Sequence, residues 1–227
     1  MLFHASPSVV LAIAGVAATG SLFATPAIAR SVGLDPQRAM AMTIATTLVM
    51  PVILYLNLCI FQDHAFTLQL FEYVQRLIIY IVGPMAISAL IFRFVSPETL
   101  HHAHQRLSSI TILLVFTFPF GLIGPFRQAF NQSAQTAFTY LFIACVLCLL
   151  FFALAFLFYR QQTLNAGLLA ALTAANRNVL LTYTVAGSYL GPDYVFLMAA
   201  IQLPTYTLPL IVRAISRYYA TSPTPSS

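Results

Sequence analysis

The chain has 227 residues, of which 60% are hydrophobic and only 7% are charged. A soluble domain of this size carries about 25% charged residues, so the composition excludes a protein dissolved in water. The net charge of +5 rests on arginines that are scattered singly at the ends of apolar segments, which argues against a surface for nucleic acid.

Seven hydrophobic segments with short connections follow one another along the chain. About 20 apolar residues in a helix cross the roughly 30 Å hydrocarbon core of a bilayer, and strand-type alternation is absent. The segments cover residues 7–29, 37–61, 71–95, 107–130, 134–159, 164–188 and 193–215. We therefore predict an all-α integral membrane protein with seven transmembrane helices in a single domain over residues 1–219. Residues 220–227 are expected to form a disordered tail.

The arginines predict how these segments are oriented. When the segments alternate across a bilayer, seven arginines fall on one side and two on the other. An excess of positive charge marks the cytoplasmic side. We expect a multi-pass protein of the cell inner membrane with the N-terminus outside and the C-terminus in the cytoplasm. The motif Ala27-Ile28-Ala29 resembles a signal-peptide cleavage site, but residues 1–8 contain no Lys or Arg, which a signal peptide requires.

An internal repeat relates the second segment to the last one. Residues 33–51 align without a gap on residues 191–209 when they are shifted by 158 positions. The two copies are five segments apart, so they face opposite ways across the membrane, as in the inverted repeats of many secondary transporters. The identities in this alignment pair Gly33 with Gly191, Asp35 with Asp193, Met40-Ala41 with Met198-Ala199, Thr47 with Thr205 and Pro51 with Pro209.

Two segments carry polar interruptions before these repeated turns. The first is interrupted around residues 19–21 and at Thr25-Pro26, where proline removes a backbone donor. The sixth contains Asn176-Arg177-Asn178, whose amides can replace backbone partners where a helix unwinds. Asn178 lies thirteen residues before Gly191, whereas Thr25 lies only eight residues before Gly33. Either the helix after the second break is longer, or the first break lies nearer Thr19.

Arg177 is the most informative residue of the sequence. A charge at the centre of a membrane helix costs about 2.5–3.5 kcal/mol by insertion scales, and such a residue marks a functional site by default. The five acidic residues lie at segment ends or in loops, so none is available as a partner near the midplane. Two interpretations remain: backbone carbonyls at a helix end stabilise the guanidinium, or it binds an anionic substrate, gripping a carboxylate with two hydrogen bonds.

Other polar residues complete the candidate site. Thr43 and Thr47 share one face of the second segment, and Gln202 and Thr205 share a face of the seventh. Taken singly, each threonine is explained as readily by a hydrogen bond to its own helix. The pattern of Cys145 and Cys148 and the histidines at positions 101, 102 and 104 do not predict a metal site. No catalytic motif occurs, so no enzyme is expected.

The stretches "TPAIARSVGLDPQRAMAMTIATTLVMPVILYL" and "TAANRNVLLTYTVAGSYLGPDYVFLMAAIQLPTYTLPLIV" resemble the fourth-fifth and ninth-tenth helices of the bile acid:sodium symporter family. The resemblance implies ten helices in two inverted repeats, with discontinuous fourth and ninth helices that cross at the substrate and sodium sites. Relative to this pattern the chain begins at the fourth helix. It is then a fragment, or it assembles with a chain that supplies the missing helices, or with a second copy.

The resemblance also implies site residues. The substrate-contacting asparagine of the ninth helix corresponds to Asn178, and the family's sodium-binding glutamate corresponds to Thr173. The Ser-Asn pair of the fourth helix corresponds to Ala24-Thr25, while the fifth-helix hydroxyls are kept as Thr43 and Thr47. Because the carboxylate is lost and Arg177 lies nearby, repulsion weakens a sodium site. We expect Arg177 to replace the ion electrostatically. Either Na⁺ or H⁺ is the candidate coupling ion, and no other cofactor is expected.

The sequence therefore predicts a partial inverted-repeat secondary transporter with two discontinuous crossing helices, which moves a small organic anion through the lipid bilayer. Substrate contacts are expected from Thr25, Asn176, Arg177, Asn178, Gln202 and Thr205, and weaker ion contacts from Thr43, Thr47 and Thr173. The alternatives are a truncated, transport-inactive relative of such carriers and a seven-helix membrane sensor or receptor, which shares the predicted topology.

Overall fold

The computed structural model describes residues 6–61, 69–100 and 133–221, and between them residues 102–103, 106–107, 110, 113–114, 117, 124, 127–128 and 130–131. Within this part the chain is helical and forms no strand, so the prediction of an all-α protein is confirmed. Four helical stretches of this part are long and apolar enough to cross a membrane: Pro36–Phe61, Leu70–Phe94, Ala134–Tyr159 and Val179–Tyr219.

The prediction of seven transmembrane helices is therefore wrong for the described residues. The predicted segments 7–29 and 164–188 are both divided, and segment 107–130 falls largely outside the described residues. The first pieces of the divided segments, α1 (Pro7–Ala18) and α8 (Leu164–Ala175), have 12 residues each. A helix of that length is about 18 Å long, too short for the hydrocarbon core. A run of apolar residues does not show where the backbone leaves the helix, which is why hydropathy alone predicts too many spans.

The N-terminal part of the fold consists of three helices. After α1 the chain is non-helical until α2 (Thr25–Ser31), and α3 (Pro36–Phe61) then forms an uninterrupted helix of 26 residues. Between α2 and α3 the backbone of Gly33 has φ of 81°, a left-handed conformation that glycine adopts without steric cost. α3 therefore packs back against both α1 and α2.

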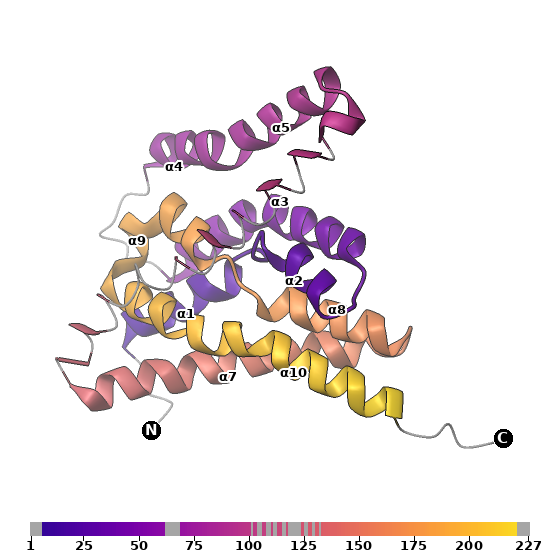
Figure 1. Cartoon of the computed structure of the whole chain (residues 1–227). Coiled ribbons are helices and arrows are strands. Elements are labelled where there is room, and N and C mark those ends of the chain that lie inside the picture. Colours follow the sequence, from indigo (N-terminus) through magenta and orange to yellow (C-terminus); the bar gives the residue numbers. More distant parts are fainter. Residues whose placement is uncertain are drawn as a thin grey trace.

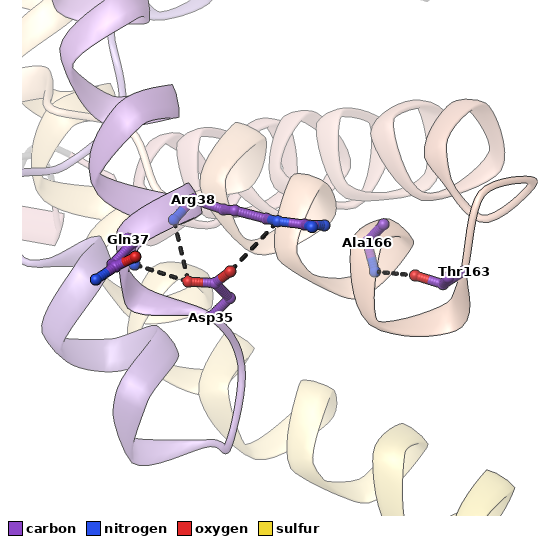
Figure 2. Close-up of polar contacts among 5 residues, drawn as sticks. All are labelled: Asp35, Gln37, Arg38, Thr163 and Ala166. Carbon is purple, nitrogen blue, oxygen red and sulfur yellow. Dashed lines mark hydrogen bonds and ion pairs between the residues drawn. The ribbon is translucent and has the colours of Figure 1, made fainter.

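Side-chain caps begin α3 and α8, and both are drawn in Figure 2. The Asp35 carboxylate accepts hydrogen bonds from the backbone amides of Gln37 (2.9 Å) and Arg38 (3.2 Å), and it forms an ion pair with the Arg38 side chain. The Thr163 hydroxyl accepts from the amide of Ala166 at 3.0 Å. These oxygens satisfy backbone donors that the first turn of a helix leaves unpaired, so the start of each helix is fixed by its own sequence.

A long apolar helix composed of α4 (Leu70–Leu77), the π-helical turn η2 (Ile78–Val82) and α5 (Gly83–Phe94) stands apart from the other helices in Figure 1. Its first part is attached to the body, because the Tyr73 hydroxyl donates to the carbonyl of Pro51 at 2.7 Å. No residue of α5 is buried.

The C-terminal part contains α7 (Ala134–Tyr159), α8, α9 (Val179–Ala200) and α10 (Gln202–Thr221). Gly191 has φ of 72° and kinks α9 immediately before Pro192. α10 continues through the first two residues of the predicted disordered tail, and the rest of that tail lies outside the described residues.

Two clusters of buried apolar side chains hold these helices together. The first joins α1, the second half of α3, α4 and α9 to the N-terminal half of α7. The second joins α2 and the start of α3 to α8, α10 and the C-terminal half of α7. The non-helical breaks of the two divided segments lie between the helices that form these clusters.

Candidate functional site

The two breaks pair with each other through their backbones. The chain leaves the helix between α1 and α2 and again between α8 and α9, and the two segments run antiparallel. The amide of Leu22 donates to the carbonyl of Asn176 at 2.8 Å, and the amide of Asn178 donates to the carbonyl of Gly20 at 2.9 Å. Backbone groups that lack helical partners inside an apolar body are satisfied in this way, which allows both breaks to persist there.

One of the two pairing hydrogen bonds joins residues that are 158 positions apart, the same offset as the sequence repeat. Gly20 and Asn178 differ by 158, and each lies thirteen residues before the glycine with positive φ that ends its unit (33 − 20 = 13 and 191 − 178 = 13). With this offset, α1 at residues 7–18 corresponds to 165–176, close to α8 at 164–175. The first break therefore begins at Thr19, which was one of the two alternatives for its position.

The first break is also attached to α3. The amide of Ser21 donates to the Thr46 hydroxyl at 3.1 Å. A Cβ atom on Gly20 would lie 3.1 Å from both the Cα and the amide nitrogen of Thr47, so a side chain at this position would meet backbone. The crossing of the two breaks is thus held against the middle of α3.

Arg177 lies at this crossing and is contacted from two sides. Its Nη1 donates to the carbonyl of Thr19 at 2.7 Å, and its Cζ lies 4.0 Å from the centroid of the Phe151 ring on α7. Thr19 caps the C-terminus of α1, where the helix dipole carries partial negative charge and favours a cation. A cation over an aromatic face is also stabilised, by up to about 2 kcal/mol where water is excluded. Of the two interpretations of Arg177, stabilisation by a backbone carbonyl at a helix end is therefore correct for one of its nitrogens, Nη1.

No carboxylate of the described residues forms an ion pair with Arg177. The acidic residues with side-chain partners in this part of the chain are Asp35 with Arg38, Glu72 with Arg76 and Asp193 with the hydroxyl of Tyr140. Among the described residues, the guanidinium thus contacts a carbonyl dipole and an aromatic ring.

Unpartnered polar atoms gather on the predicted site residues. Within the described part of the chain, six buried side-chain nitrogen or oxygen atoms have no hydrogen-bond partner. They are Thr43 Oγ1, Asn176 Nδ2 and Oδ1, Arg177 Nε, Asn178 Nδ2 and Thr205 Oγ1. All five residues belong to the nine that the sequence singled out. Because a buried polar group without a partner costs about 1–3 kcal/mol, such a concentration is typical of a binding site.

The remaining predicted residues have partners of their own. Thr25 is completely buried, and its hydroxyl is 3.1 Å from that of Ser21. The hydroxyls of Thr47 and Thr173 donate to helix carbonyls four residues earlier, and Gln202 donates to the carbonyl of Met198. Among the described residues, no hydrogen bond joins Gln202 or Thr205 to the crossing. The structure thus links Thr25 to the crossing through Ser21, which pairs with Arg177, whereas no such contact of the described residues links the predicted Gln202 and Thr205 to it.

Sequence reasoning missed three participants. Thr19 and Gly20 contribute backbone atoms, and their distance of 158 residues from Arg177 and Asn178 is the signal that could have predicted these contacts. Phe151 comes from α7 and carries no signal of its own, because it is one of 19 phenylalanines in an apolar chain.

Metal ligands do not gather in the part of the chain that the structure describes, where no group of three or more His, Cys, Asp or Glu residues occurs. Two histidines of the loop before residue 107, at positions 101 and 104, lie outside the described residues. Searches against protein-family models, curated proteins and solved structures find no match to this chain.

Proposed function

We propose that this protein is a secondary transporter of the bile acid:sodium symporter type, which moves a small organic anion across the membrane by alternating access. The observation that carries the proposal is the partly buried Arg177 at the crossing of two broken helices. Its Nε, both side-chain amide atoms of Asn176 and Nδ2 of Asn178 have no partner among the described residues, and no described carboxylate pairs with Arg177. A bound anion supplies the charge and the hydrogen bonds that these groups lack.

The arrangement of the two units supports alternating access. Each unit consists of a short helix, a break, a helix and a positive-φ glycine followed by a long helical stretch. Their correspondence at an offset of 158 residues, with the crossing where they meet, is typical of inverted repeats. In such carriers the substrate lies at the broken helices near the midplane, and rocking of one element past another exposes it to each side in turn.

Arg177 takes over the electrostatic role of a coupling cation in this proposal. The carboxylate that the family resemblance places at position 173 is replaced by a threonine, whose hydroxyl donates to its own helix. The guanidinium, four residues further along, disfavours a second cation in a medium of low dielectric. Uptake is therefore expected to proceed without a sodium gradient, with H⁺ as the remaining candidate coupling ion.

Uptake of radiolabelled carboxylates into proteoliposomes tests the function. We expect Arg177→Ala to abolish uptake. Arg177→Lys should reduce it by about tenfold to hundredfold, because lysine keeps the charge and loses the two-pronged hydrogen bonding. The matched control is Arg38→Ala, which removes a 71% exposed arginine side chain outside the site and should leave uptake unchanged. The proposal fails if wild type takes up no anion, or if the Arg177 variants transport as well as wild type.

A further inference from the structure

We infer that Phe151 of α7 is the specificity-determining residue of this site, because it fixes the plane of the Arg177 guanidinium. The site then accepts a planar, singly charged carboxylate presented edge-on. This inference rests on the proposed function and deepens it by naming the head group of the substrate.

The guanidinium is constrained in two of the directions from which an anion can approach. The Phe151 ring lies on one side of it, with the ring centroid 4.0 Å from Cζ, and Nη1 donates one hydrogen bond to the Thr19 carbonyl. Nε is buried and unpartnered. In an arginine, Nε and Nη2 form the side edge of a planar fork, directed away from Nη1. We place the ligand at that edge, because Nε has no partner among the described residues.

A planar ligand matches this edge better than a tetrahedral one. The two oxygens of a carboxylate lie in the plane of the fork and accept two parallel hydrogen bonds. A sulfonate or phosphonate has a third oxygen that leaves this plane, and on one side of the plane it meets the apolar ring of Phe151. Phe151 therefore sets a preference for flat head groups.

Charge limits the ligand to one negative unit. Arg177 is the one described cation at the crossing, and the flanking Asn176 and Asn178 are neutral. A monoanion neutralises the guanidinium, whereas the second charge of a dianion remains uncompensated where water is scarce. Asn176 is 0% exposed with both amide atoms unpartnered, so it can donate to one ligand oxygen and accept from a donor on the ligand body.

Four anions with the same benzene ring separate head-group shape from charge: benzoate, benzenesulfonate, phenylphosphonate and phthalate. Their dissociation constants are measured from the thermal stabilisation of purified protein. We expect wild type to bind benzoate about tenfold more tightly than each of the other three. Arg177→Met should bind none of them.

Variants of α7 test the role of the ring itself. Phe151→Leu keeps the apolar volume but has no π face. It should weaken benzoate binding about tenfold and bring the ratio of benzoate affinity to benzenesulfonate affinity close to one. Phe151→Trp keeps a π face and should retain the ratio. The chain contains no tryptophan, so this variant also reports binding through a unique fluorophore. The matched control is Phe152→Leu, which removes a ring that stacks on Phe156 and should leave the ratio at the wild-type value.

The outcomes distinguish two failures. The inference is wrong if the anions bind in an Arg177-dependent way but Phe151→Leu keeps the wild-type ratio of benzoate to benzenesulfonate affinity. It is also wrong if the leucine and tryptophan variants lose this ratio equally, because Phe151 then only fills space. If no anion binds wild type, or Arg177→Met binds them as well as wild type, the proposed function fails and the inference with it.

Discussion

At the scale of single residues, Gly20 is a point at which the crossing closely approaches the backbone of α3. The absence of a side chain lets its backbone lie beside the amide nitrogen and Cα of Thr47, while its carbonyl accepts from Asn178. The carbonyl of the preceding residue, Thr19, holds Arg177. One small residue therefore allows both the packing of the break and the placement of the charge.

Gly20→Ala tests this close approach. The added Cβ would lie 3.1 Å from backbone atoms that cannot rotate away, so the break must shift from α3. We expect a loss of about 1–3 kcal/mol of stability, measured as a lower melting temperature of the purified protein. Gly124→Ala is the control, because a Cβ there meets nothing within 4 Å. An unchanged melting temperature for Gly20→Ala would show that the crossing is not pressed against α3.

At the scale of elements, the two turns with positive φ are the points at which the repeated units reverse direction. Gly33 and Gly191 are the two described glycines with positive φ, and the repeat pairs them with each other. A Cβ would meet no atom within 4 Å at either position. Glycine is needed there for its backbone conformation and not for space.

Substituting each turn glycine separates conformation from packing. We expect Gly33→Ala and Gly191→Ala each to destabilise the protein by about 1–3 kcal/mol, because positive φ disfavours residues with a Cβ. Gly33→Asn should lose less than Gly33→Ala, since asparagine tolerates left-handed φ. Gly191 also has ψ of 179°, a region open essentially to glycine alone, so Gly191→Asn should lose as much as Gly191→Ala. Thermal unfolding of the four variants checks the ranking. A Gly33→Ala variant as stable as Gly33→Asn would contradict it.

The sequence predicts the two breaks, but neither the number of spans nor the contact of Phe151 with Arg177. The breaks were predictable because Pro26 and Asn176-Arg177-Asn178 disrupt helices chemically, and the offset of 158 aligned their turns. The number of transmembrane spans was not predictable, because hydropathy does not show that α1 and α8 are too short to cross the hydrocarbon core. The ring of Phe151 over Arg177 depends on how α7 packs across the crossing, a long-range contact without a local pattern.

At the scale of the whole molecule, the two units are related by more than the aligned residues. Shifted by 158 positions, α1 corresponds to residues 165–176, which nearly coincide with α8, and each of these short helices is followed by a break and a positive-φ glycine. The correspondence therefore includes the short helices and the breaks as well as the aligned residues. If the units are inverted across the membrane, the turn after α2 and the kink of α9 must lie on opposite sides.

Thiol labelling tests this inversion. Ser31 and Ser188 are exposed residues near the two turns, and Ser188 accepts a hydrogen bond from Arg76, one of the two arginines predicted to lie outside. In a background with the three native cysteines replaced by alanine, we expect a membrane-impermeant reagent to label Ser31→Cys only in inside-out vesicles. Ser188→Cys should react only in right-side-out vesicles, because the arginine distribution predicts a cytoplasmic α2 turn and an inverted repeat puts the α9 kink on the other side. Labelling of both positions from the same side would mean that the repeat is not inverted, and alternating access would lose its structural basis.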